Sequence, residues 1–150
     1  MTEAVIVSTA RSPIGRAVKG SLKDMRPDDL AVQMVLAAMA KVPELDPALV
    51  EDLLMGCGQP AGEAGYNIAR NVAVMAGWDT VPGATVNRYC SSSLQTTRMA
   101  LHAIRAGEGD IFISSGVETV SRFAKGMADF APDTQNPLFA DAVRRTEEMA

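Results

Sequence analysis

The stretch Val86-Asn87-Arg88-Tyr89-Cys90-Ser91-Ser92-Ser93-Leu94-Gln95 joins a short β-branched segment to a helical pattern that continues to about Ala106. Cys90 lies at this junction, where the unpaired N–H groups and the dipole of a helix favour negative charge. A helix start is one of the surroundings in which a cysteine becomes a reactive thiolate. Free cysteine is also among the most buried residue types, and position alone favours an inert core residue. The three small serines after Cys90 favour a nucleophile instead, because they leave room for a substrate beside backbone N–H groups.

Outward from this stretch, strand-like and helical segments alternate along the chain. The helix before the cysteine-bearing segment is expected to end at Gly77, a C′ glycine. The helix nearer the amino terminus has Asp28 as its expected N-cap, and a short turn follows Asp46. Strands are expected at 4–8, 52–57, 83–88 and 111–115, and helices at 29–41, 67–76 and 91–106. This β-α-β-α-β-α-β order predicts an α/β fold with a mostly parallel sheet covered by helices.

Composition narrows the class of protein. The chain has 150 residues, of which 47% are hydrophobic, and a formal net charge of −4. It has no basic run with interleaved aromatics, so we expect no nucleic-acid partner. No segment approaches the roughly 20 apolar residues that span a bilayer, and the amino terminus lacks signal-peptide features. The sequence therefore predicts a cytoplasmic protein without a membrane span.

The cysteines and the histidine limit the available chemistry. Cys57 and Cys90 are the two cysteines, and His102 is the single histidine. In a reducing compartment two free thiols are expected rather than a disulfide. No Cys or His pair has the spacing of a zinc site, so no metal site is predicted. Cys57 is expected to be a core residue at the end of its strand.

A cysteine nucleophile usually works with a base, most often histidine. His102 lies twelve residues beyond Cys90 on the same expected helix. At ~1.5 Å per residue this spacing amounts to roughly 18 Å, which is too far for proton transfer. If Cys90 is catalytic, its base is expected to come from outside this chain.

The pattern changes after Gly116. A loop is expected at 131–137, followed by a polar helix at 138–150 in which the chain stops. A charged, uncapped final helix is unusual for a complete core domain. We therefore expect further strands and helices to lie on additional sequence.

Four segments together resemble one family. The first is the 86–95 stretch, which resembles the nucleophile segment of thiolases, the acyl-CoA acyltransferases. The others are Ala10-Arg11-Ser12-Pro13-Ile14-Gly15, Gly65-Tyr66-Asn67-Ile68-Ala69-Arg70 and Gly116-Val117-Glu118-Thr119-Val120-Ser121. They resemble, in the same order, the family's Arg-Thr-Pro-Phe-Gly, Gly-Gln-Asn-Pro-Ala-Arg and Gly-Gly-x-Glu-Ser-Met-Ser segments. Any one match would be weak, whereas four in order are specific.

The resemblance implies a thiolase-like fold. Thiolases have two similar βαβαβαββ halves in a five-layered α-β-α-β-α sandwich, and a loop domain is inserted in the first half. Residues 1–118 would then be an incomplete amino-terminal thiolase domain, the first βαβαβαβ half. Residues 119–150 would begin the inserted loop domain.

The resemblance also implies a reaction. Cys90 would attack the ketone carbon of a 3-ketoacyl-CoA, release acetyl-CoA and form an acyl-Cys90 intermediate that free CoA resolves; the reverse is a Claisen condensation. Coenzyme A would be a co-substrate, with no permanently bound cofactor, and CoA-binding residues within this chain are not assigned. The family's activating histidine, second cysteine and oxyanion-hole asparagine lie in its second half, so this chain alone is expected to be inactive. The carboxy-terminal half of the same protein would be a partner, in a homodimer or homotetramer.

The match has departures, and alternatives stay open. Tyr89 stands where many members carry a smaller or aliphatic residue, and Ser91-Ser92-Ser93 replaces commoner patterns that contain glycine. Both could reshape the acyl pocket. The Val-Asn-Arg before Cys90 is more similar to the degradative 3-ketoacyl-CoA branch than to the biosynthetic branch. The other hypotheses are a related condensing enzyme of the ketoacyl or hydroxymethylglutaryl-CoA synthase type, and a non-catalytic lipid-carrier or assembly module.

Overall fold

A three-stranded parallel sheet forms the centre of the computed structural model, which describes residues 3–125 and 140–149. Its strands are β1 (Asp52–Gly56), β2 (Gly83–Val86) and β3 (Phe112–Gly116), in the order β2-β1-β3. The register places Gly56 opposite both Val86 and Gly116. All three strands therefore end together, at one edge of the sheet.

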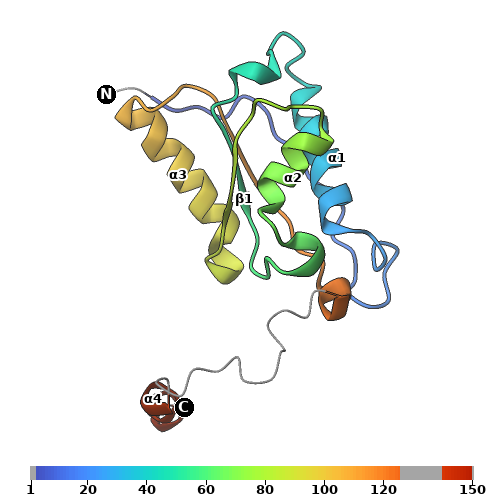
Figure 1. Ribbon diagram of the computed structural model, residues 1–150, viewed down its shortest axis with the longest axis vertical. Coiled ribbons are helices and arrows are strands. Elements are labelled where there is room, and N and C mark those ends of the chain that lie inside the picture. Colours follow the sequence, from blue (N-terminus) through green and yellow to red (C-terminus); the bar gives the residue numbers. More distant parts are fainter. Residues whose placement is uncertain (1–2, 126–139, 150) are drawn as a thin grey trace.

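Helices cover both faces of this sheet. In Figure 1, α3 (Ser92–Ala106) lies on one side of β1, and α1 (Pro27–Met39) and α2 (Ile68–Met75) lie on the other. The hydrophobic core is on the α1 and α2 side, where Leu53 and Met55 of the central strand are fully buried. The structure is therefore an α/β fold with a parallel sheet, as the alternation predicts.

Local sequence explains where the helices begin and end. Pro27 is the first residue of α1, and two aspartates follow it in the first turn, where negative charge is favourable. The prediction that Asp28 is the N-cap is wrong. Asp28 is the second residue of the helix, and Arg26 occupies the N-cap position. Gly77 follows α2 with φ +80°, so the predicted C′ glycine is confirmed. Asp46 accepts a hydrogen bond from the backbone N–H of Ala48 at 2.9 Å, at the start of the short 3-10 helix η1 (Pro47–Leu49).

The strand predicted at 4–8 is wrong. This segment is unpaired, and Val5, Ile6 and Val7 are between 69 and 78% exposed. Ser8 Oγ instead donates a hydrogen bond to the carbonyl oxygen of Ala38 at 2.7 Å, which ties the segment to α1. A cavity of about 1010 Å³ lies between the segment and the adjoining parts of α1, α3 and β3. A β-branched segment forms a strand only when its backbone can hydrogen-bond to a neighbouring strand. Here the cavity lies between residues 4–8 and β3, so these hydrogen bonds do not form.

A polar helix follows later in the chain, as predicted. α4 (Ala140–Glu148) carries ion pairs from Asp141 to Arg144 and to Arg145, and from Arg144 to Glu148, at helical spacings. The loop predicted at 131–137 lies outside the described residues. None of the helices in the described parts of the chain has the length and apolar character needed to cross a membrane.

Candidate active site

Cys90 lies in the short turn that links β2 to α3. The turn is the 3-10 helix η3 (Tyr89–Ser91), which leads directly into the first residue of α3. In parallel α/β sheets, ligands bind beside the carboxyl ends of the strands, and this turn is at that edge. Cys90 is exposed, whereas Cys57 is buried and 1% exposed. The prediction of two free thiols is confirmed, as is the prediction that Cys57 belongs to the core.

Glycine residues at the ends of β1 and β3 allow the start of α3 to pack directly on the sheet. A Cβ at Gly56 would lie 2.5 Å from the backbone nitrogen of Ser93 and 2.6 Å from the carbonyl carbon of Ser92. A Cβ at Gly116 would lie 1.8 Å from Ser93 Oγ. A larger residue at Gly56 would meet backbone atoms and force α3 away from β1, whereas a larger residue at Gly116 would require the Ser93 hydroxyl to rotate. Both glycines therefore allow the cysteine-bearing turn to lie close to the sheet.

The hydroxyl of Thr96 adds a polar contact between α3 and β3. Its side chain is fully buried, and its Oγ1 lies 2.9 Å from the Oγ of Ser114 and 2.8 Å from the carbonyl oxygen of Ser93. A buried hydroxyl that is hydrogen-bonded on both sides costs little and fixes the orientation of the helix. This contact therefore holds α3 in place about one turn after its first residue, Ser92.

The residue before Cys90 has a strained backbone. Tyr89 has φ +48°, in the left-handed region that non-glycine residues rarely adopt. Its N–H donates to Asn87 Oδ1 at 2.9 Å, and its carbonyl oxygen accepts from Ser92 Oγ at 2.6 Å. Ser92 Oγ also accepts from the N–H of Arg88 at 2.8 Å, and its side chain is buried. Both backbone polar groups of Tyr89 are thus held by side chains.

Glu118, just beyond β3, reaches the loop that follows β1. Its Oε2 accepts a hydrogen bond from the N–H of Gly58 at 2.8 Å, and its Oε1 lies 3.9 Å from the sulfur of Cys57. Burial and the nearby Glu118 carboxylate raise the pKa of Cys57 to about 11. At neutral pH Cys57 is therefore a protonated thiol, unsuited to act as a nucleophile.

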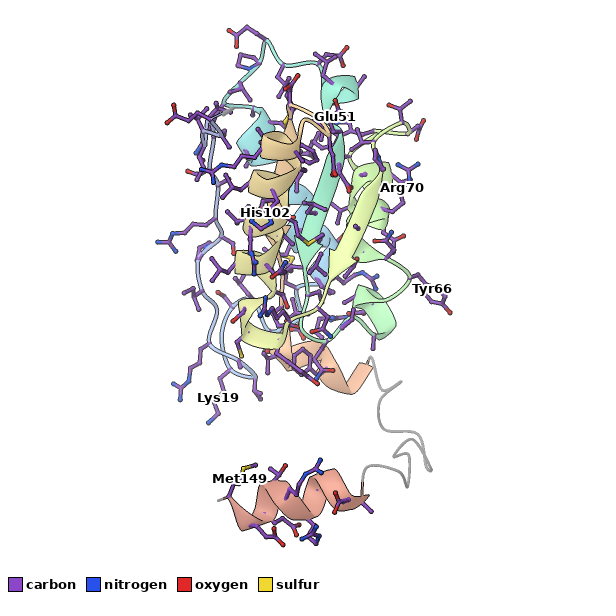
Figure 2. The ribbon with its side chains drawn as sticks, turned by 90° about the vertical axis from the view of Figure 1, so that its left-hand side faces the viewer. Lys19, Glu51, Tyr66, Arg70, His102 and Met149 are labelled. Atoms are coloured by element: carbon purple, nitrogen blue, oxygen red, sulfur yellow. The ribbon has the colours of Figure 1, made fainter. Side chains whose placement is uncertain are left out.

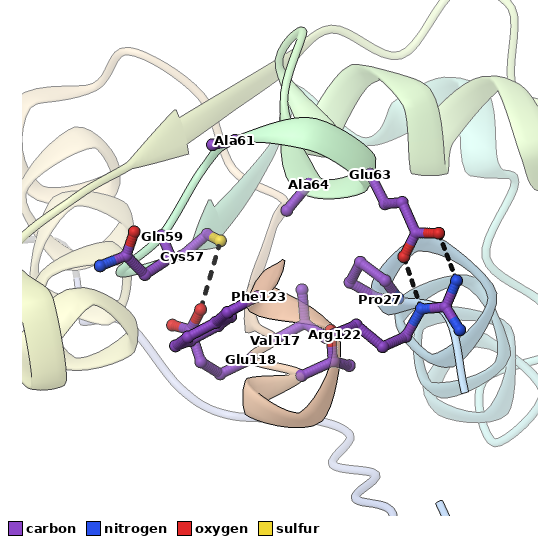
Figure 3. A pocket seen from close by; sticks show the side chains of 11 residues that line it. Pro27, Cys57, Gln59, Ala61, Glu63, Ala64, Val117, Glu118, Arg122 and Phe123 are labelled. Carbon is purple, nitrogen blue, oxygen red and sulfur yellow. Dashed lines mark hydrogen bonds and ion pairs between the residues drawn. The ribbon is translucent and has the colours of Figure 1, made fainter. Parts of the chain in front are cut away.

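Figure 3 shows the small cavity beside this pair of residues. Its walls include Cys57, Glu118, Phe123 and the ion pair of Glu63 with Arg122, in which Arg122 Nε donates to Glu63 Oε2 at 2.6 Å. The cavity volume of about 50 Å³ suits one or a few waters, far below the roughly 300 Å³ of a small ligand pocket. Cys90 lines neither this cavity nor the large one beside residues 4–8.

His102 lies on α3 and is exposed (Figure 2). The structure places it ten residues into that helix, while Cys90 lies just before the helix start. Cys90 and His102 are therefore separated along the axis of α3, and the structure does not bring them together. Among the described residues, no group of three or more His, Cys, Asp or Glu side chains is arranged to hold a metal ion.

Sequence reasoning found the nucleophile candidate and missed the residues that hold its turn. Asn87, Ser92 and Glu118 all lie within the segments that resemble thiolase motifs, but the resemblance does not predict that they hold the turn. An asparagine shortly before a turn is a known signal, because its side chain bonds the backbone two residues on. The contact of Glu118 with Gly58 joins residues 60 apart in the chain, and no local sequence pattern predicts this contact.

Comparison with known proteins identifies the family. The family model described as the thiolase N-terminal domain matches residues 4–139. The chain is 41% identical over 138 residues to a 3-ketoacyl-CoA thiolase of Shewanella denitrificans, covering 91% of this chain and 36% of that protein. It is 46% identical over 123 residues to a 3-ketoacyl-CoA thiolase of Bacillus subtilis, covering 81% of this chain and 31% of that protein. The chain thus spans about a third of the length of these relatives. It belongs to the thiolase family and corresponds to its amino-terminal portion.

Proposed function

We propose that this chain supplies the nucleophile of an acyl-CoA acyltransferase that cleaves 3-ketoacyl-CoA with CoA. Cys90 attacks the ketone carbon, the carbon–carbon bond breaks, and the departing acetyl-CoA carbanion takes up a proton. The acyl group remains on the sulfur as acyl-Cys90 until the thiol of free CoA replaces it and the cysteine regains its proton. The reverse reaction is a Claisen condensation of two acyl-CoAs.

One observation carries this proposal. Of the two cysteines, Cys90 is exposed at the start of α3, at the carboxyl edge of the sheet, and Cys57 is buried with a raised pKa. The names of the relatives support the same chemistry, since they are called 3-ketoacyl-CoA thiolases. They favour thiolysis over the synthase-type and carrier hypotheses.

The base and the rest of the substrate site belong to further sequence in this proposal. The exposed His102 is remote from the turn, and neither cavity includes Cys90. We propose that a carboxy-terminal half supplies the base, and that most of the CoA contacts come from the loop domain, within a homodimer or homotetramer. Residues 1–118 would be the incomplete amino-terminal domain and 119–150 the start of the loop domain. Action in fatty acid degradation and a cytoplasmic location are part of the same proposal.

A labelling experiment tests the identity of the nucleophile. In the longer protein that contains this chain, substoichiometric iodoacetamide at pH 8 is expected to alkylate Cys90 before Cys57, with thiolysis falling in proportion. Peptide mass spectrometry assigns the modified residue, and saturating acyl-CoA is expected to protect it. Alkylation of Cys57 at equal or greater rate would contradict the assignment.

Substitution tests the role directly. Cys90→Ala is expected to abolish CoA-dependent cleavage of 3-ketoacyl-CoA, because no sulfur remains to carry the acyl group. His102→Ala is the matched control, since this exposed residue has no part in the proposed chemistry. Measurable turnover in Cys90→Ala would refute the mechanism, and loss of turnover in His102→Ala would refute an external base.

A further inference from the structure

A continuous chain of hydrogen bonds runs from the end of β3 to the residue before the nucleophile. It begins at the Glu118 carboxylate, which accepts from the N–H of Gly58 at 2.8 Å. The carbonyl oxygen of the same Gly58 accepts from Asn87 Nδ2 at 3.2 Å. The Oδ1 of the same Asn87 side chain accepts from the N–H of Tyr89 at 2.9 Å. Three hydrogen bonds thus link Glu118 to Tyr89 across two loops.

The chain ends on the strained residue of the turn. Tyr89 is held at φ +48°, and strain of this kind persists only where the surroundings determine the conformation. Ser92 fixes the carbonyl side of Tyr89, within four residues of sequence. The N–H side depends on Asn87, which is itself held by Gly58 and, through it, by Glu118. Relaxation of Tyr89 would rotate the peptide unit that carries Cys90.

The backbone of Gly58 makes this link possible. A Cβ at Gly58 would lie 3.0 Å from Glu118 Oε2 and 3.5 Å from the carbonyl oxygen of Tyr89. The loop after β1 therefore fits closely between Glu118 and the cysteine-bearing turn. Glu118 is an exposed residue, yet its carboxylate contacts this loop through the N–H of Gly58.

We propose that Glu118 and Asn87 are positioning residues for Cys90, with Glu118 acting through Gly58 and Asn87 to hold Tyr89 in its left-handed conformation. Neither residue touches substrate in this role. Glu118 and Asn87 instead determine the orientation of the Cys90 sulfur. For its catalytic consequence the inference rests on the proposed function, whereas its structural part does not.

Amide hydrogen exchange in the 150-residue chain tests the structural part. Glu118→Ala is expected to accelerate exchange of the Gly58 amide about tenfold and of the Tyr89 amide about three- to tenfold, since a hydrogen bond to a charged group is removed. The Leu53 and Met55 amides, in the centre of the sheet, are expected to stay unchanged. Glu118→Gln keeps an oxygen that can accept from Gly58, and is expected to restore both rates to within about twofold.

The relay is tested by combining substitutions. Asn87→Ala is expected to accelerate the Tyr89 amide by itself, and adding Glu118→Ala to it is expected to change that amide no further. Asp46→Ala is the matched control, because Asp46 is an exposed carboxylate that accepts one backbone N–H, from Ala48 at 2.9 Å. It is expected to accelerate the Ala48 amide alone. The proposal is overturned if Glu118→Ala accelerates all sheet amides equally, or if it leaves Tyr89 unchanged.

Kinetics in the longer protein test the catalytic consequence. Glu118→Ala is expected to lower kcat for thiolysis about tenfold with little change in KM, and Glu118→Gln to recover most of it. A residue that served stability alone would lower the amount of active enzyme, and active-site titration with iodoacetamide would reveal that loss. If the exchange pattern holds but no thiolysis is found, the proposed function fails and the positioning network stands. If thiolysis is normal in Glu118→Ala, the positioning role in catalysis is refuted.

Discussion

Replacement of Gly56 by alanine tests how the sheet places the nucleophile. Gly56 is buried at the end of β1, and a Cβ there would meet three backbone atoms at the start of α3, at 2.5, 2.6 and 2.9 Å. The closest contact is about 0.9 Å shorter than ordinary van der Waals contact, which begins at 3.4 Å. No side chain can rotate to relieve it, so α3 must move away from β1.

The cost follows from this geometry. Overpacking a well-packed site costs typically about 1–3 kcal/mol, and a clash with backbone belongs to the upper part of that range. We expect Gly56→Ala to lower the free energy of unfolding of the 150-residue chain by about 2–3 kcal/mol. For a chain of this size that amounts to a fall of roughly 4–12 °C in Tm.

Gly116→Ala provides the matched comparison. Its Cβ would meet the side-chain oxygen of Ser93 at 1.8 Å and the Ser93 Cβ at 3.0 Å. Because a hydroxyl can rotate away, we expect a cost of about 1–2 kcal/mol, and Ser93→Ala should remove about half of it. Ser93→Ala should not rescue Gly56→Ala, since the atoms met there are backbone.

Urea unfolding followed by circular dichroism measures all these variants. In the Ser93→Ala background, the stability losses from Ser93→Ala and Gly56→Ala are expected to add within about 0.5 kcal/mol. The losses from Ser93→Ala and Gly116→Ala are expected to depart from their sum by about 0.5–1 kcal/mol. A cost below about 0.5 kcal/mol for Gly56→Ala, or its rescue by Ser93→Ala, would show that α3 does not pack on β1 as described.

The remaining predictions concern the loops, the pH dependence and the chain by itself. Arg70→Ala (Figure 2) should lower the free energy of unfolding, measured in urea, by about 2–3 kcal/mol, because Arg70 donates to three carbonyl oxygens of residues 78–81. Arg70→Lys should recover less than half of this loss. Burial raises the pKa of Asp52, so its native state binds a proton more strongly than its unfolded state, and stability falls as pH rises through the folded pKa. The free energy of unfolding of Asp52→Asn relative to the wild type should therefore increase between pH 3 and pH 7, by less than about 1 kcal/mol because the group is partly exposed. A difference that does not change with pH would contradict this. The 150-residue chain alone should show no CoA-dependent thiolysis, and turnover above a Cys90→Ala control would refute the external base. In size exclusion it should associate, since sheet edges and apolar side chains are left uncovered, and a stable monomer would contradict that expectation.

Much of the fold could be predicted from local pattern. The segments around β1, β2 and β3 and the helices α1 to α3 were placed within a few residues, because apolar runs, proline starts and glycine ends act over short distances. The segment at 4–8 has the same local character, yet it is unpaired. A segment forms a strand only if the backbone of another strand lies beside it, and the local sequence of the segment does not show whether one does.

The sequence by itself determined that this is an α/β chain of the thiolase family with Cys90 at a strand-to-helix junction. It also determined that the single histidine lies too far along the helix to serve that cysteine. Only the tertiary structure decided which cysteine is exposed, because burial depends on the layers that pack over a residue. It also decided how the turn is held. Glu118, Gly58 and Asn87 come from three separate segments, and only the shared carboxyl edge of a parallel sheet brings their hydrogen-bonding groups within reach of Tyr89.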